Sequence, residues 1–97
     1  MTDERQIHIP ASFIAIYTRA SQPRPSASRI WLEQRHDLCE DLAQLLAEQA
    51  KSKVWQLGID MTDALARIEQ GLPEIALDLS TLECTWVLTR VKEILEV

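Results

Sequence analysis

The sequence predicts an all-α fold, a small four-helix bundle in which one helix is much longer than the others. Residues 26–57, between Pro25 and Gly58, contain no proline or glycine and consist mostly of good helix formers. Helix-capping signals also punctuate the second half of the chain, at Asp60 and Ser80. The expected helices span residues 10–18, 29–57, 61–70 and 81–95.

The chain is expected to form one domain over residues 1–97, because 97 residues suffice for a single modest core. Residues 1–6 are polar and are predicted to be a frayed tail. Residues 19–28 contain two prolines and several serines and alanines, which is typical of a linker.

The charge balance argues against nucleic-acid binding. Fifteen acidic residues against ten basic ones give a net charge of −5, whereas phosphate neutralisation needs a basic face. No apolar run approaches the roughly 20 residues that a membrane span needs, and the N-terminus lacks the layout of a signal peptide. We therefore expect a cytoplasmic protein that binds neither nucleic acid nor membranes.

The first element is ambiguous between helix and strand. Pro10 suits the first turn of a helix, and Phe13, Ile16 and Tyr17 then fall on one face, which favours a helix over residues 10–18. The isoleucines of the segment also fit a period of two, so that a strand within residues 7–17 remains the alternative.

The long second helix has clear ends. Ser28 is a suitable N-cap, and Gly58 a suitable residue just beyond the C-terminus. A helix over residues 29–57 is about 43 Å long at 1.5 Å per residue. A compact chain of this size is only about 30 Å across. Either a kink or a partner must account for the difference, and we expect a homodimer.

The long helix has an apolar face centred on Leu42 and an acidic face opposite. The residues expected on the core face are Trp31, Leu32, Leu38, Cys39, Leu42, Ala43, Leu45, Leu46, Ala50 and Leu57, interrupted by Arg35, Gln49 and Lys53. The acidic face carries Glu33, Asp37, Glu40, Asp41 and Glu48. It is either a solvated face or a docking surface for a basic partner.

The last two helices have marked starts. Asp60 is a suitable N-cap for the third helix, and Gly71 is expected to end it. Pro73 excludes a central strand over residues 72–79 but leaves a short edge strand open. Ser80 and Glu83 form a capping box that begins the fourth helix.

Two tryptophans do not fit a simple core. Trp55 points away from Leu42, toward the acidic side, and Trp86 lies with Leu82 and Arg90 off the main apolar face of the last helix. Tryptophan is enriched at interface hot spots. For each of the two tryptophans, both a core position and an interface position remain open.

These features favour a non-enzymatic protein-interaction module, an adaptor or regulator, over an enzyme. It would bind a protein partner through an apolar, tryptophan-bearing patch beside the acidic helix face. The candidate partner-binding residues are Trp86, Leu82, Arg90, Trp55, Glu40, Asp41 and Glu48. The alternative is a holdase-like accessory chaperone that binds unfolded segments.

The sequence carries no recognisable catalytic or cofactor motif. Two glycines are too few for a phosphate-binding loop. His36, Cys39 and Glu40 stand at i, i+3 and i+4, which leaves a small metal-binding protein or enzyme as a second alternative, although a tetrahedral site needs a further ligand. We expect no cofactor and no bound metal. Cys39 and Cys84 are expected to be reduced and buried, with a disulfide or redox pair as the alternative.

Four segments carry a resemblance to a known family: Ile9-Pro-Ala-Ser-Phe-Ile-Ala15, Arg35-His-Asp-Leu-Cys-Glu-Asp-Leu-Ala43, Leu57-Gly-Ile59 and the last helix around Trp86-Val87. They resemble a family of short, uncharacterised proteobacterial proteins often labelled "ATPase with chaperone activity". The resemblance implies that activity here, but the chain has no phosphate-binding loop to support its ATPase half. The family offers no catalytic residues to carry over.

Overall fold

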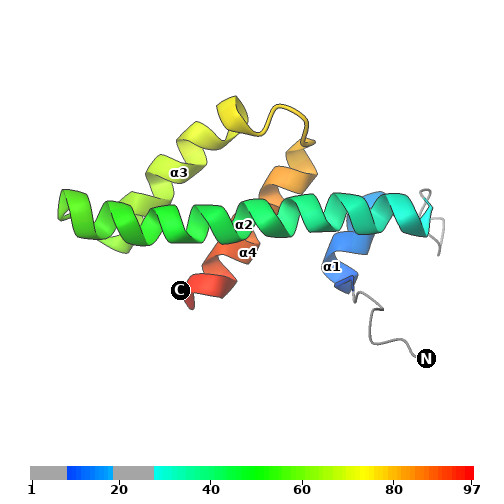
Figure 1. Ribbon diagram of the computed structural model, residues 1–97, viewed down its shortest axis with the longest axis horizontal. Coiled ribbons are helices and arrows are strands. Elements are labelled where there is room, and N and C mark those ends of the chain that lie inside the picture. Colours follow the sequence, from blue (N-terminus) through cyan, green and yellow to red (C-terminus); the bar gives the residue numbers. More distant parts are fainter. Residues whose placement is uncertain (1–8, 19–27) are drawn as a thin grey trace. The chain divides into compact units, whose positions relative to one another are not determined.

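The computed structural model describes residues 9–18 and 28–97, and these ranges contain helices but no strand (Figure 1). The elements in chain order are α1 (Ala11–Ile14), the 3₁₀-helix η1 (Ala15–Tyr17), α2 (Arg29–Leu57), α3 (Met61–Ile75) and α4 (Thr81–Leu95). The all-α prediction is confirmed. The expected frayed tail, residues 1–6, and residues 19–27 of the expected linker lie outside the described residues.

The chain forms two compact units, Met1–Leu38 and Cys39–Val97, and α2 contributes residues to both. The N-terminal unit contains α1, η1 and the first turns of α2. The C-terminal unit contains the remainder of α2 together with α3 and α4. The expectation of one domain over residues 1–97 stays a prediction.

The N-terminal unit is held by aromatic contacts. Phe13 is fully buried and meets the rings of Tyr17 and His36 edge-on, each at a centroid distance of 5.4 Å. Tyr17 in turn meets Trp31 at 5.1 Å, with the two rings nearly perpendicular. Since residues 11–17 are helical, the helix is the correct alternative for the described part of this segment. Pro10 is the N-cap rather than the first helical residue, so the helix begins at Ala11, one residue later than expected.

Both ends of α2 are the expected ones. The backbone N–H of Trp31 donates to Ser28 Oγ at 3.2 Å, as an N-cap requires. Gly58 has a φ of +67°, in the left-handed region that favours glycine, and its N–H donates to the Val54 carbonyl at 3.1 Å. The predicted span of residues 29–57 is confirmed.

The buried face of α2 is rotated from the expected one. The buried residues of this helix are Leu32, His36, Cys39, Ala43, Leu46, Ala47 and Ala50. The expectation that Trp31, Leu38, Leu45 and Leu57 share the core is wrong, since their exposed fractions lie between 41% and 54%. The prediction centred the face on the bulkiest residues, whereas alanines and a cysteine occupy most of the buried positions.

Helix α3 begins as expected and ends later. Asp60 Oδ1 accepts a hydrogen bond from the Asp63 backbone N–H at 2.8 Å, so the predicted N-cap is confirmed. The helix then continues through Gly71 and Pro73 to Ile75. The expected end at residue 70 and the alternative edge strand over residues 72–79 are both wrong.

Burial explains the extra turn of α3. Continuing the helix places Leu72, which is 1% exposed, one turn beyond the buried Ile68. Burying a leucine side chain contributes about 1.5–3 kcal/mol, whereas a glycine inside a helix costs only about 1 kcal/mol. Pro73 lies in the last turn, where its missing N–H deprives only the Glu69 carbonyl of its usual i+4 donor.

Helix α4 has the predicted capping box and the predicted bounds. The Glu83 N–H donates to Ser80 Oγ at 3.1 Å, and the Ser80 N–H donates to Glu83 Oε1 at 2.9 Å. In Figure 1, α3 leaves the C-terminal end of α2, and α4 returns across α2. Together they enclose a core of Cys39, Ala43, Leu46, Ala47, Ala50, Ala64, Ile68, Leu72, Ala76, Trp86, Val87 and Val91.

Alanine substitutions at the two glycines are expected to change stability in opposite directions. Gly58→Ala should destabilise the chain by about 1–2 kcal/mol, because alanine is strained at the left-handed φ of +67°. Gly71→Ala should stabilise it by about 0.5–1 kcal/mol, because this glycine lies inside α3. A Cβ at either position meets no atom within 4 Å, so backbone conformation alone decides the sign. Urea unfolding followed by circular dichroism measures both, and a destabilising Gly71→Ala would contradict the extended α3.

Candidate interaction surface

The part of α2 that belongs to the C-terminal unit carries an exposed stripe opposite its buried face. The stripe consists of Asp41, Leu45, Glu48, Ser52 and Trp55, and all five are exposed. Their spacing of four, three, four and three residues places them along one side of the helix. We call this set the α2 stripe.

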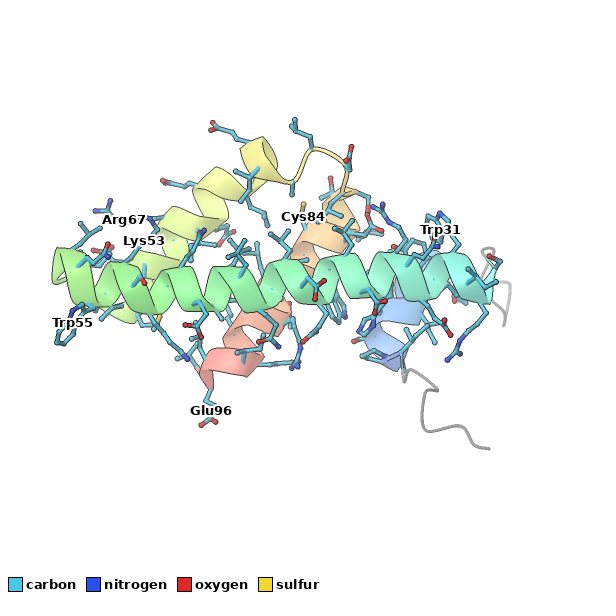
Figure 2. The ribbon with its side chains drawn as sticks, viewed as in Figure 1. Trp31, Lys53, Trp55, Arg67, Cys84 and Glu96 are labelled. Carbon is cyan, nitrogen blue, oxygen red and sulfur yellow. The ribbon has the colours of Figure 1, made fainter. Side chains whose placement is uncertain are left out.

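Trp55 is the largest exposed side chain of the stripe. Its exposed fraction is 89%, and Figure 2 shows it on the opposite side of the helix from Lys53. The last buried residue of α2 is Ala50, and none of the residues 51–57 is buried. The last turns of α2 therefore contribute little to the core of their unit, and Trp55 supplies a large amphipathic surface to solvent.

Both charged residues of the stripe are acidic. Asp41 and Glu48 are both exposed, and Lys51 Nζ lies 3.5 Å from Glu48 Oε2. That pair is also exposed, with more than half of each side chain in solvent, and contributes little to stability. The stripe thus combines two apolar side chains with two carboxylates. Trp55 was expected on the same side as Asp41 and Glu48, whereas Leu45 was expected in the core.

Two other predicted site residues pair with each other inside the C-terminal unit. Arg90 donates from Nε to Glu40 Oε1 at 2.8 Å and from Nη2 to Glu40 Oε2 at 3.1 Å, and its Nη1 reaches Glu93 Oε1 at 3.2 Å. The hydrogen bonds that Arg90 donates to Glu40 raise the pKa of Arg90 above its ordinary value. This fork joins α2 to α4, so that Glu40 and Arg90 have a structural role that the sequence alone did not reveal.

Removing the charge of Glu40 is expected to destabilise the chain measurably. Glu40→Gln keeps the shape but loses the charge-assisted pair, and a loss of about 1 kcal/mol follows for a bidentate pair that is partly open to solvent. The matched control, Glu33→Gln, breaks the exposed i,i+4 pair with Arg29 and should cost less than about 0.5 kcal/mol. Urea unfolding compares the two. Equal losses would show that the contact between α2 and α4 is worth no more than a surface pair.

The structure separates the two tryptophans whose placement was left open. Trp86 is 9% exposed and belongs to the core, whereas Leu82, one turn earlier on α4, is 60% exposed. Because Trp86 is buried and Arg90 is paired with Glu40, Leu82, Trp86 and Arg90 do not form the continuous second face that was expected for α4. Trp55, by contrast, has no part in the core.

The three residues of the possible metal site, His36, Cys39 and Glu40, do not form a cluster of ligands. Cys39 is completely buried, and Glu40 is engaged by Arg90. Over the described ranges 9–18 and 28–97, no group of three or more His, Cys, Asp or Glu side chains could hold a metal ion. The metal-binding alternative therefore rests on sequence spacing alone.

None of the described helices combines the length with the apolar character that crossing a bilayer requires.

Both cysteines are thiols not joined in a disulfide, but the expectation that both are buried is wrong for Cys84. Cys39 is buried, and Cys84 is half-buried near the start of α4 (Figure 2). Burial raises the pKa of the Cys84 thiol, and the negative charge of the adjacent Glu83 raises it further. Since the thiolate is the reactive form, Cys84 is a slow nucleophile near neutral pH.

Alkylation with iodoacetamide is expected to distinguish the two thiols. In the folded chain Cys84 should react and Cys39 should not, and the rate at Cys84 should reach half its maximum at a higher pH than for free cysteine. Glu83→Gln should lower that midpoint, because it removes a negative charge while glutamine can still complete the capping box. Mass spectrometry of quenched samples measures both effects. An unchanged midpoint would exclude a charge effect from Glu83.

Sequence reasoning identified only one residue, Leu82, of a second exposed apolar surface. Ile75, Leu77 and Leu82 are 60–81% exposed around the connection from α3 to α4. Ile75, Leu77 and Leu79 alternate with other residues in a segment that was expected to be a connection, with a short edge strand left open, so no exposed surface was predicted there. Leu45 was likewise assigned to the core because its neighbours on the helix are apolar.

Comparison of the chain with protein-family models, with curated proteins and with solved structures gave no match. The proposals below therefore rest on the geometry of the chain itself.

Proposed function

We propose that this chain is a non-enzymatic protein-interaction module, an adaptor or regulator whose partner contacts the α2 stripe and takes Trp55 as its anchor. The observation that carries the proposal is the 89% exposure of Trp55 at the end of a helix whose last turns bury no side chain. An exposed indole is costly to leave in water and is among the groups that contribute most when an interface covers them.

The charges of the stripe favour a partner segment that carries Lys or Arg. Asp41 and Glu48 are exposed on the same side of the helix as Trp55. A partner cation can pair with these carboxylates or lie over the indole face, and both arrangements strengthen when the interface excludes water. Such a partner binds more weakly as the salt concentration rises, because exposed charges are screened.

A second copy of the chain is another occupant of the same surface, and a homodimer remains our proposal for the free protein. The end of α2 supports it, since none of the residues 51–57 is fully buried within their own unit. Two copies that met along the α2 stripe would bring like charges at Asp41 and Glu48 close together. Dimerisation there should therefore strengthen with salt, which is the opposite of the behaviour of a basic partner.

A holdase-like role is the second candidate function. It is favoured by the scatter of exposed apolar side chains over the C-terminal unit, including Trp55, Leu77 and Leu82. A holdase should suppress the aggregation of several unrelated client proteins. A dedicated adaptor should suppress none of them.

Replacing Trp55 is expected to abolish binding without changing the fold. Affinity purification of the tagged chain from its native cell, with mass spectrometry, should recover a partner that is at least about fivefold depleted with Trp55→Ala. The matched control is Gln56→Ala, which alters the next exposed residue of α2 and should retain the partner. Helicity should be equal in all three proteins. A partner recovered equally with Trp55→Ala would refute this anchor.

A further inference from the structure

A small apolar hollow lies where α3 passes into α4. It has a volume of about 230 Å³ and is lined by Pro73, Ala76, Leu77, Leu79, Thr81 and Cys84. Small-molecule sites usually occupy roughly 300–1,000 Å³. The hollow is therefore better matched to a single inserted side chain than to a whole ligand.

Leu77, which lines this hollow, is a strongly exposed apolar side chain, and two further exposed apolar residues are adjacent to lining residues in the sequence. Leu77 is 81% exposed, and Ile75 and Leu82, each next in sequence to a lining residue, are 61% and 60% exposed. We call these three residues and the hollow the α3–α4 patch. Isolated exposed leucines are common on protein surfaces, but three exposed bulky aliphatic residues in or next to the segments that line one concavity are typical of an interaction site.

Hydrogen bonds hold the connection that carries Leu77 in place. The Ala76 N–H donates to the Leu72 carbonyl at 2.9 Å, and the Leu79 N–H donates to the Ala76 carbonyl at 3.1 Å. The capping box of Ser80 and Glu83 follows immediately. A partner that docks here meets an ordered surface and loses little free energy in ordering it.

The negative charge around the patch favours a partner that carries positive charge. From Ile68 to Thr89 the sequence contains four carboxylates and no lysine, arginine or histidine. Of these acids, Glu74 and Asp78 are exposed on either side of Ile75 and Leu77. Two copies of the patch would repel each other, whereas a segment with cationic flanks is complementary to it.

We propose that the α3–α4 patch is a docking site for a partner protein segment in which one bulky apolar side chain is flanked by Lys or Arg. The apolar side chain enters the hollow beside Leu77, and the flanking cations face Glu74 and Asp78. The site uses no residue of the α2 stripe, so it stands or falls independently of the function proposed above.

A defined peptide tests the site directly. The probe is fluorescein-labelled Lys-Lys-Leu-Phe-Lys-Lys, and the controls replace its lysines by glutamates or its Leu-Phe pair by Ser-Ser. Fluorescence anisotropy should show binding of the first peptide only, and the affinity should fall between 50 and 500 mM salt. Leu77→Ser should weaken binding at least about fivefold, whereas Trp55→Ala should leave it unchanged. Circular dichroism checks that Leu77→Ser, at an exposed turn position, keeps its helicity.

Cys84 provides a second readout because its thiol lines the hollow. The bound peptide should slow alkylation of Cys84 in the wild-type chain and should not do so in Leu77→Ser. Absence of binding, equal binding of the glutamate peptide, or binding lost with Trp55→Ala and retained with Leu77→Ser would each overturn the proposal. Self-association of the free chain that disappears with Leu77→Ser would assign the patch to a second copy and would also overturn it.

Discussion

The residues on the buried side of α2 are mostly small, and the bulky side chains of the helix therefore lie outside the core of the C-terminal unit. Cys39, Ala43, Ala47 and Ala50 are each at most 1% exposed, and Leu46 is the one bulky residue among the buried positions of this part of α2. A buried alanine removes far less apolar area from water than a leucine does, at about 0.8 kcal/mol per CH₂. This part of α2 therefore packs on the rest of its unit mainly through small side chains, while its bulky side chains Leu45 and Trp55 are exposed to solvent.

Polar interactions at defined points compensate for the small apolar contact. The two-pronged contact between Arg90 and Glu40 joins residues that are 50 positions apart in the sequence. Capping bonds at Asp60 and at Ser80 define where α3 and α4 begin. A planar guanidinium that meets a carboxylate with two bonds restricts orientation as well as distance, which apolar packing of small residues does poorly.

The ends of the helices were predictable wherever a local chemical group produces them. Ser28, Gly58, Asp60 and Ser80 act through their own side chains or their own backbone conformation, so the sequence displays them. The end of α3 was not predictable in this way, because the burial of Leu72 outweighs the local signal of Gly71.

The faces of the helices were harder to predict than their ends, since periodicity identifies a side but not its neighbour. Leu45 and Trp86 both lie on helices with apolar residues on more than one side, and only the packing places the first in solvent and the second in the core. The same limit applied to the candidate site. Trp55 and the acids of α2 were predictable as a group, whereas the fork from Arg90 to Glu40 joins two elements and has no local signature.

The two exposed apolar surfaces of the C-terminal unit share one electrostatic feature. Trp55 lies on a stripe with Asp41 and Glu48, and Leu77 lies between Glu74 and Asp78. Apolar area alone would attract any other apolar surface, including that of another copy, whereas carboxylates at its edge penalise acidic partners and favour basic ones. In a chain of net charge −5, this arrangement lets bulky side chains remain exposed while weakening contact between two copies at low salt. Exposure and acidity together, rather than either one alone, define a surface suited to a basic protein partner.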